Sequence, residues 1–167
     1  MSEAGGPPVR DRDTAGRARN ARPRDALGRP LQRSQPGEPV TPDDLDLGPA
    51  EALALAQQLI DSGRPFHAHE VLEASWHAAP PAERELWRGL AQLAVGLTHA
   101  RRGNARGAVA LLRRGGLAVG GYAGRDPHGV DAAAVAAAAE GLAGQISSAG
   151  LGALPEPRLQ LVRPPDG

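Results

Sequence analysis

The residues best suited to catalysis or ligand binding lie in one stretch with the sequence FHAHEVLEASW. On a helix, His69, Glu73 and Trp76 stand at positions i, i+4 and i+7 and therefore share one face. Glu70 lies beside that face, whereas His67 points about 200° away from His69. Two histidines so arranged cannot bind one metal ion from a single regular helix. The spacing predicts one polar helix face that carries imidazole, carboxylate and indole groups.

The stretch has the pattern H-E-x-x-E, which resembles known metal-binding helices only in part. It lacks the second histidine of the H-E-x-x-H metalloprotease helix and the E-x-x-H pairs of di-iron bundles. A metal site would need a ligand from another helix, and His69, Glu73 and His99 form the candidate set. Their tips would have to converge within about 4–5 Å of one point for divalent metal binding.

A second polar stripe follows on the next predicted helix. Its members, at i, i+3, i+7 and i+10, are Gly89, Gln92, Gly96 and His99. Glycines on a helix face let another helix approach closely or open a groove. We expect this stripe to pack against the face of His69 and Glu73 and to enclose polar groups near Trp76 and Trp87, both of which should be substantially buried.

These side chains allow more than one interpretation. They could satisfy one another as a buried hydrogen-bond network that fixes the helix register. They could instead line a pocket for a ligand or a metal ion. We interpret the chain as a helical binding or scaffold module whose polar groove takes a protein segment or a small molecule. The alternative is a metal-assisted hydrolase with Glu70 or Glu73 as base. The candidate pocket comprises His69, Glu70, Glu73, Trp76, Gln92, His99 and Asn104.

The composition limits the remaining function classes. The chain has 167 residues, enough for one domain, and its 19 basic and 19 acidic residues give a net charge of zero. This balance argues against a nucleic-acid partner or a membrane surface bound by bulk charge. The absence of cysteine excludes disulfides, thiolate metal sites and Cys nucleophiles. No apolar run of 18 residues and no signal-peptide core occur, so we expect a soluble, cytoplasmic protein.

The apolar residues are unevenly distributed along the chain. Residues 1–40 contain five large apolar side chains, whereas residues 49–102 contain fourteen. The sequence therefore predicts a disordered Arg/Pro/Gly-rich arm over 1–46, a helical domain over 47–150 and a flexible C-terminal tail over 151–167.

From residue 49 onward the apolar period is that of a helix, with no convincing strand pattern. Proline, glycine and asparagine signals divide the domain into about five helices, so we expect an all-α compact bundle built from helical hairpins. The expected helices cover 49–62, 65–78, 82–102, a segment capped by Asn104 and a segment from near Asp131. We expect Gly115-Gly116 to loosen the fourth of these, and His128 to be solvated in the loop that follows it.

A short internal sequence repeat supports the hairpin arrangement. Gly63 and Gly103 are 40 residues apart, and each precedes an apolar pair at the same distance, Val71-Leu72 and Leu111-Leu112. Two helical hairpins packed side by side would produce this repeat.

Taken together, these motifs are similar to those of the DUF309 family, small bacterial, archaeal and plastid proteins of uncharacterised function. The similarity rests on GRPFHAHEVLE from Gly63, WRGLAQLAV from Trp87 and GNARGA from Gly103, and it is dense over 63–115 and looser to about 150. RDALGRPL from Arg24 resembles the arm of actinobacterial members. The resemblance implies an all-helical domain but no reaction, cofactor or substrate. The positions that match the family's H-E-x-x-E-x-x-W signature and its second block are His69, Glu70, Glu73, Trp76, Gly89, Gln92, His99, Asn104 and Gly107.

Overall fold

The computed structural model describes residues 46–154 and 156–164, and within them the secondary structure is helical. This confirms the all-α fold. The α-helices are α1 (Pro49–Asp61), α2 (Pro65–Ala78), α3 (Arg84–Arg101), α4 (Ala105–Gly120) and α5 (Ala132–Ala149). Three short 3-10 turns join or follow them: η1 (Pro81–Glu83), η2 (Pro127–Gly129) and η3 (Leu151–Ala153). Except for Asp46, the predicted arm over 1–46 lies outside the described residues.

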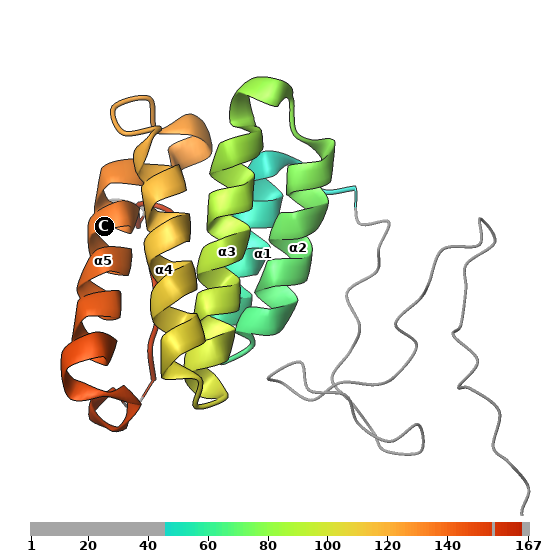
Figure 1. Cartoon of the computed structure of the whole chain (residues 1–167). Coiled ribbons are helices and arrows are strands. Elements are labelled where there is room, and N and C mark those ends of the chain that lie inside the picture. Colours follow the sequence, from blue (N-terminus) through green and yellow to red (C-terminus); the bar gives the residue numbers. More distant parts are fainter. Residues whose placement is uncertain (1–45, 155, 165–167) are drawn as a thin grey trace, which may run out of the picture.

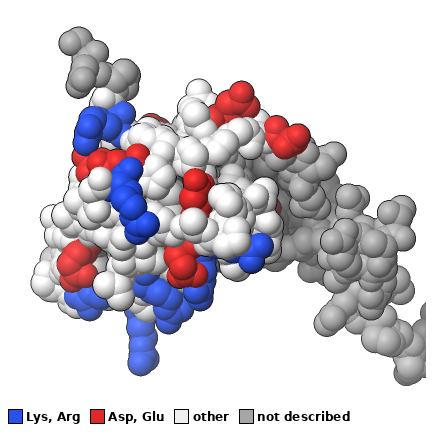
Figure 2. Space-filling model, turned by 90° about the horizontal axis from the view of Figure 1, so that it is seen from above, with Lys and Arg blue, Asp and Glu red and all other residues white. Residues whose placement is uncertain are grey.

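Each helix packs on its neighbours in the chain, and consecutive helices run in opposite directions (Figure 1). The centre of the bundle is α3, which lies between α2 and α4, while α5 lies at the outer edge beside α4. Among the described residues, no helix is long and apolar enough to cross a membrane. Seen from above, this end of the bundle carries acidic and basic side chains interspersed with uncharged surface (Figure 2).

The predicted hairpin repeat is present as two turns of the same geometry. Gly63 and Gly103 have φ angles of 78° and 81°, in the left-handed region that favours glycine. The backbone N–H of the residue after each glycine donates to the carbonyl five residues earlier, at 2.7 and 2.8 Å. Both turns therefore end their helices in the same glycine-dependent way, which explains the 40-residue offset between them.

The core of the bundle is built on α3. Its leucines are the buried stripe that the periodicity predicts: Leu86, Leu90, Leu93 and Leu97. The glycines of α3 allow the close approach of another helix, one of the two roles expected, but they face α4 and not the His69 and Glu73 face of α2. A Cβ added to Gly89 would lie 3.0 Å from the carbonyl oxygen of Gly115, and one added to Gly96 would lie 3.0 Å from Leu112. The two glycines thus allow α3 and α4 to approach closely.

Gly115 and Gly116 do not loosen the chain as expected, because α4 continues through them to Gly120. The tightest position is Gly115, where an added Cβ would lie 2.7 Å from the carbonyl oxygen of Gly89. The loss in helix propensity at Gly115 is therefore offset by close contact between two helix backbones.

We expect Gly115→Ala to lower the free energy of unfolding by about 1–3 kcal/mol, because a methyl group must displace the backbone of α3. The matched control is Gly141→Ala on α5, where an added Cβ has nothing within 4 Å. This control should raise stability by about 0.5–1 kcal/mol through helix propensity alone. Urea unfolding measures both changes, and equal effects at the two positions would contradict the close α3–α4 contact.

The C-terminal segment differs from the flexible tail that the sequence suggested. Leu159 and Leu161 are buried, although Pro, Gly and charged residues surround them. The amide of Gln57 on α1 holds the segment: its Nε2 donates to the Leu159 carbonyl at 3.1 Å, and its Oε1 accepts from the Leu161 N–H at 2.7 Å. Further along, the Arg163 N–H donates to the Gly129 carbonyl at 3.2 Å. Residues 156–164 therefore connect α1 to the loop before α5.

The connection between α4 and α5 is tied to the start of α3. His128 has a φ of 58°, and its Nε2 lies 2.9 Å from the carboxylate of Glu83. The same carboxylate accepts from the indole Nε1 of Trp87 at 3.3 Å, and the Tyr122 hydroxyl donates to the Ala82 carbonyl at 2.7 Å. The hydrogen bond from His128 is the main cause that lowers the pKa of Glu83. His128 is exposed, as expected, but it is also held in place by its contact with Glu83, which the sequence did not predict.

Candidate functional site

A surface hollow of about 190 Å³ lies between α2 and α3, at the place where the sequence predicts a polar face. We call it the α2–α3 hollow. The α2 residues that line it are His69, Glu73 and Trp76, and the α3 residues are Arg88, Ala91, Gln92 and Val95. Of the predicted pocket residues, His69, Glu73 and Trp76 are thus brought together with Gln92. Sequence reasoning missed Arg88, Ala91 and Val95. Arg88 and Val95 lie one turn from Gln92, and Ala91 lies one turn from both of them, so all share one side of α3.

The carboxylate of Glu73 lies between two imidazoles on α2. Its Oε2 is 3.2 Å from Nε2 of His69, and its Oε1 is 3.7 Å from Nε2 of His77. The His77 ring stacks on Trp76 with centroids 4.8 Å apart. The Glu73 side chain is 42% exposed and Trp76 is half-buried, so this face is open to solvent. These side chains therefore do not form a hydrogen-bond network that is closed off from solvent. The expected burial of Trp76 is correct only in part.

Burial is the largest influence on the protonation of His69. It lowers the pKa of His69 below its ordinary value of 6.5, against the opposing charges of Glu73 and Glu70. A neutral imidazole has one N–H and one acceptor nitrogen. Nε2 of His69 lies 3.2 Å from the Glu73 carboxylate, while Nδ1 is buried with no hydrogen-bond partner among the described residues. The α2 face thus holds a carboxylate beside an imidazole with one unpartnered buried nitrogen.

The lowered pKa of His69 predicts that acid destabilises the fold. The unfolded chain binds a proton near pH 6.5, whereas the folded chain does so only at a lower pH, so stability present above 6.5 is lost as the pH falls toward the folded pKa. His99 acts in the same direction, because burial and then the charge of Arg102 lower its pKa. We expect the free energy of unfolding to fall as the pH is lowered below about 7, and His69→Gln to reduce that slope.

The control for this prediction is His77→Gln, since the His77 side chain is 66% exposed on the same helix. It should leave the slope of stability against pH unchanged. Chemical denaturation at a series of pH values gives the slopes. An unaltered slope in His69→Gln would contradict the effect of burial on His69.

Glu70 does not line the α2–α3 hollow, because it pairs with His67 on another side of α2. The distance from its Oε2 to His67 Nδ1 is 3.3 Å. The His67 ring is buried, at 3% exposure, and its Nε2 has no hydrogen-bond partner among the described residues. His67 shares the buried side of α2 with Val71, four residues later, and this spacing was the sequence signal for its burial.

His99 and Asn104 form a separate structure at the turn between α3 and α4. Asn104 Nδ2 lies 3.0 Å from His99 Nδ1, and its Oδ1 accepts from the Gly107 N–H at 3.0 Å, which caps α4. A Cβ on Gly107 would lie 2.6 Å from Asn104 Nδ2, so a larger residue there would displace the Asn104 side chain. The second block of matching residues therefore includes a helix cap, and neither His99 nor Asn104 lines the α2–α3 hollow.

The proposed metal ligands do not form a ligand set. Within residues 46–154 and 156–164, no group of three or more His, Cys, Asp or Glu side chains is placed to hold a metal ion. His69 and Glu73 lie together, but His99 is engaged with Asn104 at the α3–α4 turn. The geometry therefore gives the metal-assisted alternative no support.

The fold and the hollow together define a small all-helical domain with a polar surface between its second and third helices. Residues 53–111 match the family described as a domain of unknown function, DUF309. The matched range contains every residue that lines the α2–α3 hollow. The chain is also similar to the uncharacterized protein YpuF of Bacillus subtilis (strain 168), with 48% identity over 48 residues. That alignment covers 28% of each chain, and no solved structure matches.

Proposed function

We propose that this chain is a binding module that holds a short segment of a partner protein in the α2–α3 hollow. The observation that carries the proposal is the combination of a half-buried indole, a partly exposed carboxylate and an imidazole in one hollow. A hollow of about 190 Å³ has room for about one side chain, which suits a peptide that inserts a single residue.

The chemistry of the hollow favours a basic side chain on the partner. A Lys or Arg group can lie over the face of Trp76, where the ring attracts a cation, and reach the carboxylate of Glu73. Arg88 on the opposite wall suits a neighbouring acidic residue or a carboxylate. We therefore propose a partner segment with a basic residue followed or preceded by an acidic one.

The experiment is a selection of random peptides displayed on phage against the full chain. The enriched peptides should share a Lys or Arg residue, and their affinity should fall at least about tenfold in Trp76→Leu and in Glu73→Gln. Glu51→Gln, an exposed carboxylate on α1, is the matched control and should leave the affinity unchanged. Equal binding to all three variants, or a selection that enriches no peptide, would contradict the proposed partner.

Two further expectations stay predictions. The first is a cytoplasmic location. The second is the resemblance of residues 24–31 to the arm of actinobacterial DUF309 proteins; these residues lie outside both the described residues and the matched range.

A further inference from the structure

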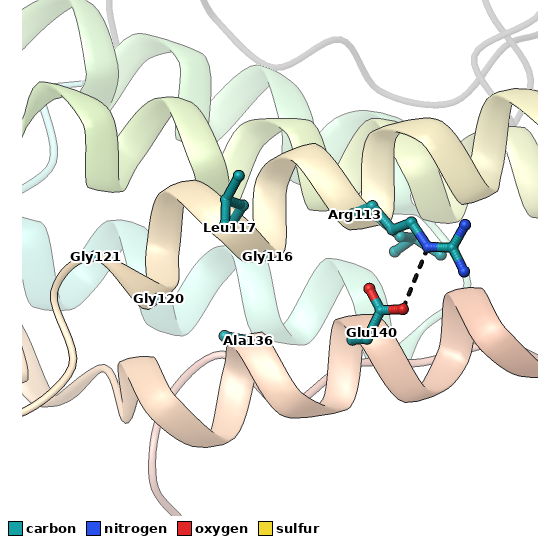
Figure 3. A pocket seen from close by; sticks show the side chains of 8 residues that line it. Arg113, Gly116, Leu117, Gly120, Gly121, Ala136 and Glu140 are labelled. Carbon is teal, nitrogen blue, oxygen red and sulfur yellow. Dashed lines mark hydrogen bonds and ion pairs between the residues drawn. The ribbon is translucent and has the colours of Figure 1, made fainter.

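A second and larger hollow lies along the outer side of the α4–α5 pair (Figure 3). We call it the α4–α5 hollow, and its volume is about 670 Å³. It is lined by Leu112, Arg113, Gly116, Leu117, Gly120, Gly121, Ala136 and Glu140, none of which lines the α2–α3 hollow. Leu117 is 82% exposed, and no other large hydrophobic side chain in the described residues is so classed. An exposed leucine beside an apolar hollow is typical of an interaction surface.

Glycine and alanine residues shape the floor of this hollow. A Cβ on Gly116 would lie 3.1 Å from Ala139, and one on Gly120 would lie 3.3 Å from Ala136, so α4 and α5 approach closely along this line. Because the side chains at the seam are so small, they leave space above the seam unfilled. The α5 helix adds little charge to the surface, since Glu140 is its one charged residue among 18.

We propose that the α4–α5 hollow binds the same hollow of a second copy of this chain. In a two-fold dimer each copy presents the same patch, so the patch must contain both a projecting group and a space that receives it. Leu117 projects from the rim of the hollow, next to the space over Gly116 and Gly120 (Figure 3). Leu117 of each copy inserts into the hollow of the other, near the two-fold axis.

The charges at the rim fit the same arrangement. Arg113 Nε lies 3.3 Å from Glu140 Oε1, and both side chains are about half exposed or more. A patch with one positive and one negative group is complementary to itself when it is turned by 180°, because each charge can face its opposite on the other copy. A partner of uniform charge would be repelled by one of the two groups.

The helices are long enough for such an interface. With 16 and 18 residues, α4 and α5 extend about 24 and 27 Å, and two such pairs would form a four-helix arrangement between the copies. In Figure 1, α5 and α2 lie on opposite sides of α3 and α4, so the dimer leaves the α2–α3 hollow accessible. The proposed dimer therefore does not depend on the proposed peptide binding.

Sedimentation equilibrium of the full chain tests the dimer. The wild type should have twice the monomer mass of 17.2 kDa at tens of micromolar. Leu117→Arg should raise the dissociation constant at least about 30-fold, since it places two charges at the centre of the interface. Gln58→Arg, at an exposed position of α1, should leave it unchanged. Glu140→Arg should weaken the dimer, and Arg113→Glu combined with Glu140→Arg should restore it.

The absence of cysteine from the sequence permits a second, independent measurement. Leu117→Cys places one thiol per chain near the proposed axis, so mild oxidation should produce a covalent dimer, whereas Gln58→Cys should not. A wild type of 17.2 kDa up to about 1 mM would overturn the proposal. A dimer that Leu117→Arg leaves intact would also overturn it, as would a monomer in which the thiol at position 117 is protected from labelling.

Discussion

Replacing Trp87 with alanine should lower the free energy of unfolding by about 3–5 kcal/mol, a large part of the stability of a small domain. Trp87 is the largest fully buried side chain, at 2% exposure, and it lies among the leucines of α3. Its indole N–H also donates to Glu83, which in turn holds His128 of the α4–α5 connection. Truncation removes the apolar contacts and one of the two hydrogen-bond donors to that carboxylate.

Trp76→Ala is the comparison for this prediction. Because Trp76 is half-buried at the edge of the α2–α3 hollow, its loss should cost about 1–2 kcal/mol. Urea unfolding followed by circular dichroism measures both variants without relying on tryptophan emission. A change below about 1 kcal/mol for Trp87→Ala would contradict its place in the core.

The second large effect is expected at Gln57, whose side chain holds the C-terminal segment. Gln57→Ala should lower the free energy of unfolding by about 2–4 kcal/mol, because it leaves two buried backbone groups, the Leu159 carbonyl and the Leu161 N–H, without partners. If the segment then detaches, Leu159 and Leu161 lose their burial as well. Trypsin should cleave after Arg158 faster in the variant than in the wild type.

Gln58→Ala is the matched control, since Gln58 is the next residue on α1 and is exposed. It should change stability by less than about 0.5 kcal/mol. Equal stability of the two variants, with equal resistance to trypsin, would show that residues 156–164 add nothing to the fold.

The helices could be predicted from the sequence because local signals define their ends. Pro65 begins α2 at the expected residue, and Gly63 and Gly103 end the helices before them in left-handed turns. Asn104 caps α4 as expected. The C-terminal segment could not be predicted, since the residue that binds it, Gln57, lies 102 positions from Leu159. Its Pro-rich composition indicates disorder, and only the tertiary partner overrides that tendency.

The candidate site could be predicted in part for a similar reason. The i, i+4, i+7 spacing places His69, Glu73 and Trp76 on one face of α2 whatever the rest of the fold does. The stripe on α3 could not be assigned in the same way, because it spans the boundary between two neighbouring helices. Its glycines face α4, Gln92 lines the α2–α3 hollow, and His99 joins the cap of α4. The rotation of α3 between its neighbours decides these roles.

The α4–α5 hollow could not be predicted from the sequence, because no motif or spacing distinguishes the residues that line it. Its lining consists mainly of glycine, alanine and leucine, which are equally common in helix interiors. Only the position of Leu117 on the outside of α4 distinguishes it from the buried leucines of α3.

The Glu73→Gln variant tests most directly whether the polar face of α2 serves recognition or stability. Both its peptide affinity and its free energy of unfolding are measured. Glu73 is 42% exposed and its contacts are to His69 and an exposed histidine, so the change in unfolding free energy should be below about 1 kcal/mol. The affinity for a selected peptide should fall at least about tenfold, while Glu51→Gln changes neither property. A loss of about 2–3 kcal/mol in stability with unchanged peptide affinity would contradict a binding role and show that the face is a structural network.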